Sequence, residues 1–260
     1  MSTKTIQGKL WSIAPQKWAQ HFEPWFIPMY KDALKQLKLN NEHVVLDAGC
    51  GSGMFSNMVI QTGAQLIGID AAPGLLEVAR KRNPEHNFLE EDLEALPFAD
   101  NYFDVVTGFN SFQYAGNFDN VLIEAARVLK PGGKLVIGIW DKPENSEATE
   151  ILKSIGKLLP PPPAGTPGPF ALSEDGRIEN SCKAAGLNVV SKKTIPCPFL
   201  YVDLNDAINS FMGTGPAAAA LNLNEQSIVE NTIATALQPY GVVDGFYALQ
   251  NNFLLFVTEK

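Results

Sequence analysis

The sequence of 260 residues has few of the side chains that form disulfides or bind metals. Its three cysteines, Cys50, Cys182 and Cys197, lie far apart and form no CxxC pair. The three histidines are equally scattered, without the spacing of metal ligands. This pattern argues against a disulfide framework and against a cysteine-based zinc site. We therefore expect a reducing, cytoplasmic setting and no metal.

The sequence also lacks a basic cluster and a long hydrophobic run. It has 20 Lys and Arg against 28 Asp and Glu, which gives a net charge of −8. An acidic chain is a poor partner for nucleic acid or for an anionic membrane surface. No run approaches the roughly 18 apolar residues of a membrane span, and the first residues lack the apolar core of a signal peptide. Neither nucleic acid nor a membrane is an expected partner.

What the sequence does contain is an alternation of short apolar runs with helical patterns. With 45% hydrophobic residues it can bury a sizeable core. The alternation predicts a parallel sheet with helices on both faces, linked by right-handed crossovers. The expected strands are 43–49, 65–70, 86–92, 102–110 and 134–141, and the expected helices are 53–63, 71–83 and 118–133.

The flanking segments have different patterns. Residues 11–40 carry many aromatics interrupted by prolines, which predicts short helices. Residues 158–170 form a stiff, proline-rich connection. The remaining expectations are a helix at 173–186 with Ser173 as candidate N-cap, an edge strand at 187–199, helices over 203–239 with a weak point at 213–220, and a strand or hairpin at 246–260.

The sharpest local feature is a glycine-rich turn with carboxylates near it. Glycines at positions 49, 51 and 53 follow Asp47, where the first strand should meet the first helix. Asp70 and Asp92 end the next two expected strands, so the three carboxylates should meet at one edge of the sheet. A carboxylate at the end of the second strand can accept hydrogen bonds from ribose hydroxyls. These residues together predict a nucleoside site.

The turn also indicates which nucleoside ligand fits. The dinucleotide motif has glycines at offsets 0, 2 and 5, whereas here the offsets are 0, 2 and 4. Asp47 before the turn would repel a pyrophosphate. A ligand with a ribose, no phosphate and a cationic amine suits the site better, and S-adenosylmethionine has that description.

Four stretches carry a family resemblance: VVLDAGCGSG, LIGID, EEDLEALPFADNYFDVV and ARVLKPGGKLVIGIW. Together they resemble the class I S-adenosylmethionine-dependent methyltransferases, in the small-molecule (type 11-like) branch. The resemblance implies a Rossmann-like α/β fold with seven strands in the order 3-2-1-4-5-7-6, strand seven antiparallel. It further implies a methyltransferase domain over 41–260 with a helical insert around 203–239. Residues 1–40 would form an N-terminal helical lid segment.

The resemblance also implies ten cofactor-binding residues. Near the methionine part of S-adenosylmethionine these are Asp47, Gly49, Cys50 and Gly51, with the Cys50 side chain interpreted as packing. At the ribose and adenine they are Asp70, Ala71, Asp92 and Leu93, and near the sulfonium they are Asn110 and Ser111.

Residues for catalysis and for acceptor binding are less clearly marked. His21 and Tyr114 are the candidate catalytic residues, with an exposed helix histidine and a packing tyrosine as the alternatives. Aromatic side chains could form an apolar cage for the acceptor or simply pack the lid onto the sheet. The candidates for such a cage are Trp11, Trp18, Phe112, Tyr114 and Trp140.

The favoured function is that of a methyltransferase of the EC 2.1.1 class. It would transfer a methyl group from S-adenosylmethionine to a small-molecule acceptor by in-line displacement. One alternative is a non-catalytic protein that binds S-adenosylmethionine or S-adenosylhomocysteine. A second is an NAD-dependent oxidoreductase, which the glycine offsets and Asp47 disfavour. The residues do not select the acceptor, the atom methylated or the oligomeric state.

Overall fold

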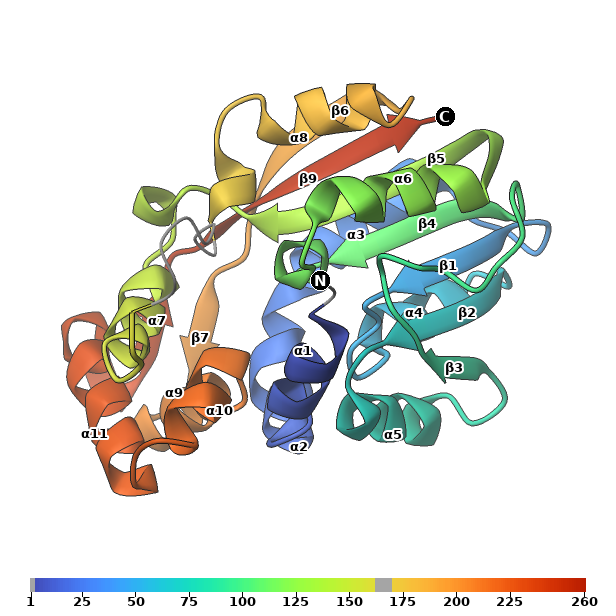
Figure 1. Cartoon of the computed structure of the whole chain (residues 1–260). Helices are drawn as coiled ribbons and strands as arrows, with labels where there is room; N and C mark the ends of the chain where they lie inside the picture. Colours follow the sequence, from blue (N-terminus) through green and yellow to red (C-terminus); the bar gives the residue numbers. More distant parts are fainter. Residues whose placement is uncertain (1–2, 162–169) are drawn as a thin grey trace.

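The computed structural model describes residues 3–161 and 170–260, and its centre is a mixed β-sheet (Figure 1). Within these residues the large sheet has seven strands in the order β3-β2-β1-β4-β5-β9-β6. The first five strands are parallel, and β9 runs antiparallel between β5 and β6. The predicted order with an antiparallel seventh strand is therefore confirmed. The strands are β1 (Val44–Ala48), β2 (Gln65–Asp70), β3 (Asn87–Glu90), β4 (Phe103–Phe109), β5 (Leu129–Trp140), β6 (Asn188–Pro196) and β9 (Asn252–Glu259).

Helices cover both faces of this sheet (Figure 1). Side chains alternate between the faces along each strand. Val45 thus joins the buried cluster beneath one set of helices, and Leu46 joins the cluster beneath the other. Because neither face meets water, the central strands are mostly apolar. One set is α3 (Ile27–Leu37), α4 (Met54–Ile60) and α5 (Pro73–Arg82), and the other is α6 (Phe118–Val128) and α8 (Arg177–Ala184).

A second group of elements lies beyond the end of β5 (Figure 1). Three helices connect β7 to β8, within the segment between β6 and β9. These are α9 (Leu204–Met212), α10 (Gly215–Leu221) and α11 (Gln226–Leu237). They pack with α7 (Ala148–Gly156) and with a two-stranded sheet of β7 (Phe199–Tyr201) and β8 (Tyr247–Leu249). The break between α9 and α10 falls at Gly213–Thr214, inside the expected weak point.

The N-terminal segment lies between this second group and α5 (Figure 1). It consists of α1 (Lys4–Trp11), α2 (Pro15–Lys17), a π-helical turn (Trp18–Phe22) and a 3-10 turn (Glu23–Phe26). The prolines of this segment occupy the first positions of α2, of the 3-10 turn and of α3. Proline is tolerated there because the amide it lacks has no helical partner. Short helical pieces were expected, and they are found.

Several local expectations were wrong. The helix expected over 118–133 ends at Val128, because Leu129 already pairs with Phe103 as the start of β5. Ser173 is not an N-cap: α8 begins at Arg177 after Gly176, whose φ is +77°. The segment 246–260 forms two strands, but β8 pairs with β7 instead of making a hairpin with β9.

The region between β5 and α8 differs most from expectation. It contains α7, which the proline-rich composition of the following residues did not suggest. Most of the expected stiff connection, residues 162–169, lies outside the described residues. In the part of the chain that the structure does describe, no helix has the length and hydropathy needed to cross a membrane.

Candidate functional site

A tight glycine-rich turn joins β1 to α4 and forms one wall of a cavity. Gly49, Gly51 and Gly53 have φ values of +83°, +54° and +75°, a region that favours glycine because it lacks a Cβ. A Cβ on Gly49 would lie 2.1 Å from the Cβ of Ser111. The chain can therefore bring this turn against the loop after β4 only with glycine at position 49.

Hydrogen bonds fix the turn to the end of β2. The amide of Gly49 donates to the carbonyl oxygen of Ile69 at an N–O distance of 2.8 Å. The amide of Gly51 donates to Oδ2 of Asp70 at 2.9 Å, and the amide of Ala72 donates to Oδ1 at 2.8 Å. Burial raises the pKa of Asp70, although these amides lower it. Asp70 is thus held in one orientation on the cavity wall.

Asp92 reaches the same cavity from the segment after β3. β3 ends at Glu90, so Asp92 lies two residues beyond the strand that it was expected to end. Its Oδ1 accepts a hydrogen bond from the amide of Glu94 at 2.9 Å. This turn places Asp92 and the neighbouring Leu93 on the wall beside Asp70.

Most residues expected to bind the cofactor line this one cavity, which opens where β1, β2, β3 and β4 end. Parallel strands bring their carboxyl ends to one edge of a sheet, and open α/β sheets bind ligands there. The expected residues on the wall are Gly49, Gly51, Asp70, Ala71, Asp92, Leu93, Asn110 and Ser111.

The side chains of Asp47 and Cys50 lie behind the wall. The carboxylate of Asp47 is buried and accepts hydrogen bonds from Ser56 Oγ at 2.6 Å and Thr107 Oγ1 at 3.0 Å. Burial raises the pKa of Asp47 to about 6, against the lowering effect of those two hydroxyls. Burial also raises the pKa of the Cys50 thiol well above its usual value. Asp47 therefore ties β1, α4 and β4 together, and Cys50 packs.

Helix α1, which lies within the predicted helical lid segment 1–40, closes the opposite side of the cavity. Lys4, Gln7 and Trp11 recur at helical spacing and face inward. On the same helix, a Cβ added to Gly8 would lie 2.2 Å from the carbonyl oxygen of Ala71. Glycine at position 8 lets α1 rest directly on the segment after β2. That lone glycine was the only sequence signal for this contact.

A buried charged cluster, which the sequence analysis did not predict, lies beside the glycine turn. Glu23 accepts hydrogen bonds from Ser52 Oγ and from Arg82 Nη1, the latter at 3.2 Å. Burial raises the pKa of Glu23 to about 7, although Ser52 and Arg82 lower it. A Cβ on Gly51 would lie 3.5 Å from both Glu23 Oε1 and Trp18 Nε1. A carboxylate oxygen and an indole N–H thus both face the turn at Gly51.

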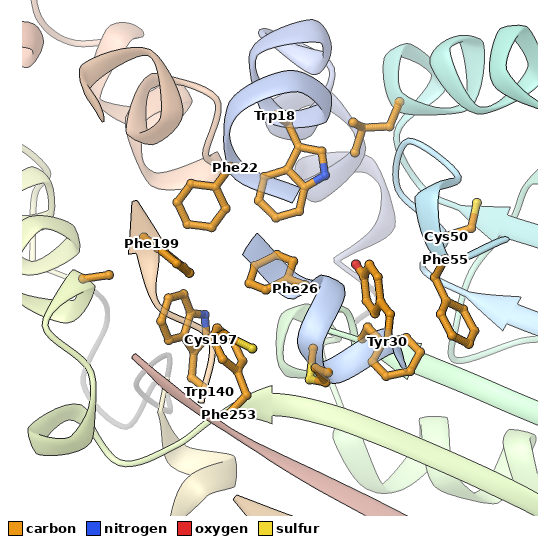
Figure 2. Packing of buried hydrophobic residues seen from close by; sticks show 14 of the residues in the cluster. Trp18, Phe22, Phe26, Tyr30, Cys50, Phe55, Trp140, Cys197, Phe199 and Phe253 are labelled. Carbon is orange, nitrogen blue, oxygen red and sulfur yellow. The ribbon is translucent and has the colours of Figure 1, made fainter. Parts of the chain in front are cut away.

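A second cavity lies next to the first. The two share Trp11, Trp18, Asn110 and Tyr114, and Trp140 lines the second one. Trp18 and Trp140 belong to one buried hydrophobic cluster, which Figure 2 shows. Phe112 lies elsewhere, in the core cluster that includes α6, with its ring against Gly108.

The two candidate catalytic residues have different surroundings. His21 lines neither cavity, and its Nδ1 lies 2.7 Å from Oδ1 of Asp206 on α9. Tyr114 lines both cavities, and burial raises its pKa to about 12, so its hydroxyl keeps its proton at neutral pH. Among residues 3–161 and 170–260, no group of three His, Cys, Asp or Glu could hold a metal ion.

The fold agrees with solved methyltransferase-like structures. The YcgJ protein of Bacillus subtilis has a TM-score of 0.58 at 19% identity, over 89% of this chain and 97% of that one. A Burkholderia thailandensis 1,6-didemethyltoxoflavin-N1-methyltransferase, solved with S-adenosylhomocysteine, has a TM-score of 0.52 at 13% identity, over 94% and 80% of the two chains. The sheet order and the cavity at its carboxyl edge define a class I S-adenosylmethionine-dependent methyltransferase fold.

The family assignment rests on the sequence of the sheet's first half. Residues 46–137 match the family model described as "Methyltransferase domain". The chain therefore carries a domain of that methyltransferase family. The matched segment runs from within β1 to within β5 and includes every expected cofactor-binding residue.

Curated relatives share this same part of the chain. A demethylmenaquinone methyltransferase of Renibacterium salmoninarum is 38% identical over 99 residues, which are 38% of this chain and 42% of the relative. A malonyl-[acyl-carrier protein] O-methyltransferase of Serratia marcescens is 38% identical over 92 residues, 35% and 36% of the two chains. The chain spans between 36% and 59% of the length of the curated relatives it matches.

The buried carboxyl of Asp47 predicts a specific pH dependence of stability. Its pKa is about 6 in the folded protein, against 3.8 as the ordinary value. The folded protein keeps this proton to a higher pH than the unfolded chain does. Protonated Asp47 therefore stabilises the folded protein below about pH 4, and this stabilisation is lost as the pH rises through 6. The free energy of unfolding falls by about 3 kcal/mol over that range.

The variant Asp47→Asn removes this titration. The asparagine oxygen can still accept from Thr107, and the Ser56 hydroxyl can turn to accept from the new amide. Urea unfolding at pH 4.5 and 7.5 should show a smaller loss of unfolding free energy in the variant than in the wild type. Equal losses in the two proteins would contradict a buried, protonated Asp47.

Proposed function

We propose that this chain transfers a methyl group from S-adenosylmethionine to a small apolar acceptor. The observation that carries the proposal is that Gly51, Asp70 and Asp92 meet on one cavity wall at the carboxyl edge of the sheet. When bound, S-adenosylmethionine supplies a methyl group on a positively charged sulfur. The protein's task is then to hold the reactants in line and to exclude water, which can contribute roughly 7–11 kcal/mol to the lowering of the barrier.

Asp70 and Asp92 would hold the adenosine part. Two backbone amides orient the Asp70 carboxylate, and each of its oxygens keeps a lone pair for a ribose hydroxyl. Asp92 stands on the wall of the same cavity, so it is placed to accept from the adenine amino group. Leu93 would pack on the base. The donor set thus fits an uncharged nucleoside.

The Glu23 side of the glycine turn would hold the amino-acid part. Trp18 Nε1 is buried and has no hydrogen-bond partner in the described structure. An unsatisfied buried N–H costs about 1–3 kcal/mol, which a ligand oxygen would recover. Glu23 Oε1 and Trp18 Nε1 each lie 3.5 Å from the position that a Cβ would take on Gly51. Glu23 Oε1 is therefore placed to accept from an ammonium group. These two groups suit the carboxylate and ammonium of a methionine.

The relatives leave the acceptor undetermined. By their names they act on demethylmenaquinone, on a malonyl group of acyl-carrier protein and on a sterol. Their similarity covers between 35% and 51% of this chain, and the family match lies in the cofactor-binding part. We also propose a cytoplasmic location, which the buried, unpaired state of all three cysteines supports.

The main test is the variant Asp70→Asn. Loss of one charged acceptor should weaken S-adenosylhomocysteine binding by about 10–100-fold, since hydrogen bonds to charged groups contribute about 1.5–3 kcal/mol. Isothermal titration calorimetry measures the affinity, and circular dichroism checks the fold. Unchanged affinity would refute the ribose role. Stabilisation of the wild type by NAD alone would favour an oxidoreductase, and the absence of labelled-methyl transfer to any acceptor would favour a non-catalytic binder.

The variant Glu23→Gln tests the amino-acid end separately. Methylthioadenosine has the adenosine part of the cofactor but no ammonium or carboxylate, so it serves as the matched control ligand. We expect the variant to weaken S-adenosylhomocysteine binding at least tenfold and to leave methylthioadenosine binding unchanged. If both ligands lose the same affinity, or neither does, Glu23 does not contact the ammonium group.

Helix α1 is proposed to act as a lid. The cavity beneath it has a volume of about 90 Å³, well below the roughly 300–1,000 Å³ of ligand pockets. The helix lies across the cavity, with Lys4 Nζ donating to the carbonyl oxygen of Glu90 at 3.0 Å. We therefore propose that α1 lifts to admit the cofactor and then rests on it.

The variant Gly8→Leu tests this lid. A side chain at position 8 would meet the carbonyl oxygen of Ala71 and keep α1 from resting there. We expect S-adenosylhomocysteine to dissociate at least ten times faster in stopped-flow measurements. Lys9→Leu places the same side chain on the exposed face of α1 and should behave as the wild type. Equal dissociation rates in all three proteins would show that α1 is not a lid.

A further inference from the structure

The second cavity has the size and position of an acceptor site. Its volume is about 380 Å³, within the roughly 300–1,000 Å³ of small-molecule sites. It shares four wall residues with the cofactor cavity, among them Asn110 and Tyr114. A molecule held there would therefore lie against the cofactor at the end of β4.

Aromatic rings from separate parts of the chain form its walls. Trp18 stacks on Phe22 with ring centroids 5.1 Å apart and planes at 17°, and the edge of Trp11 meets Trp18 at 4.9 Å. Trp140 comes from the end of β5 and contacts Phe170 at 6.4 Å. Figure 2 shows the ring of Trp18 beside that of Phe22, and Trp140 away from this pair, next to Phe253. An aromatic ligand can meet such rings edge-to-face or by offset stacking.

The described lining offers almost no charge. It contains no Asp, Glu, His or Cys, and its one cation, Lys153, is half-exposed with Nζ paired to Glu150 Oε1 at 2.6 Å. Residues 162–169, PPAGTPGP, contain no titratable side chain by sequence. An ionised group buried without a partner costs several kcal/mol. A carboxylate or an ammonium group on the acceptor would therefore be strongly disfavoured here.

We infer that the second cavity binds a planar, uncharged aromatic molecule, which, on the proposed methyltransferase function, is the acceptor. The polar side chains at its junction with the cofactor cavity are neutral: they include the Asn110 amide and the Tyr114 hydroxyl. They can orient a polar atom of the ligand toward the cofactor while the rings hold the rest. Specificity then comes from ring stacking and from the exclusion of charge.

Gly156 provides a way to block this cavity. It lies on the wall at the end of α7, and a Cβ there would meet nothing within 4 Å. Gly156 is also exposed, so Gly156→Trp should place a ring at the open rim of the cavity without disturbing the fold. Lys157→Trp is the matched control, because Lys157 is exposed and does not line the cavity.

The experiment compares three naphthalene ligands of similar shape. 2-Naphthol, 2-naphthoate and 2-naphthylmethylammonium are titrated calorimetrically at pH 7.5 into protein saturated with S-adenosylhomocysteine. We expect 2-naphthol to bind at least ten times more tightly than either ion. We also expect Gly156→Trp to weaken 2-naphthol binding at least tenfold, whereas Lys157→Trp leaves it unchanged. Both variants should bind S-adenosylhomocysteine as the wild type does.

Three results would overturn the inference: no binding of 2-naphthol to the saturated wild type, binding of either ion as tight as that of 2-naphthol, or unchanged 2-naphthol binding in Gly156→Trp. Failure of S-adenosylhomocysteine to bind at all is a different outcome. It would refute the proposed function, and the inference about the acceptor would fall with it.

Discussion

The site depends on how the glycine turn after β1 is fixed to the end of β2. The carbonyl of Ile69 and the carboxylate of Asp70 accept amide hydrogens of the turn, and the absence of a Cβ at Gly49 lets Ser111 approach. These contacts set the positions of the first, second and fourth strand ends relative to one another. The orientation of Asp70, and with it the cavity wall, follows from this arrangement.

Asp47 and Glu23 are two carboxyl groups buried near the turn, and burial disfavours their ionised form. Asp47 is satisfied by hydroxyls on α4 and β4, and Glu23 by Ser52 and Arg82. Burial nevertheless raises the pKa of each, to about 6 and about 7. Asp47 has no open side and acts structurally. Glu23 faces Gly51. A cationic ligand bound there would favour the ionised carboxylate and so lower the pKa that burial raises.

The N-terminal segment and the helical insert both contribute walls to the second cavity. A Cβ at Gly213 would lie 2.5 Å from the backbone nitrogen of Trp18, so the two pieces touch closely. His21 and Asp206 form an ion pair or hydrogen bond across the same junction. Neither piece alone encloses the second cavity, whose walls come from both and from the end of β5. The shape of the second cavity is therefore a property of their packing.

The sequence by itself determined a parallel sheet covered by helices and the residues at its carboxyl edge, because the alternating apolar runs and the turn motif depend on local spacing. The order of the strands came from the family resemblance. Asp70 and Asp92 could be placed from their positions at or just beyond the ends of strands. Tertiary structure alone decided that the Asp47 side chain turns inward, that α1 rests through Gly8 on the segment after β2 and that Glu23 lies beside Gly51. Each of these depends on contacts between residues far apart in the chain, such as Gly8 with Ala71 and Glu23 with Arg82, and such long-range contacts leave no periodic pattern in a sequence.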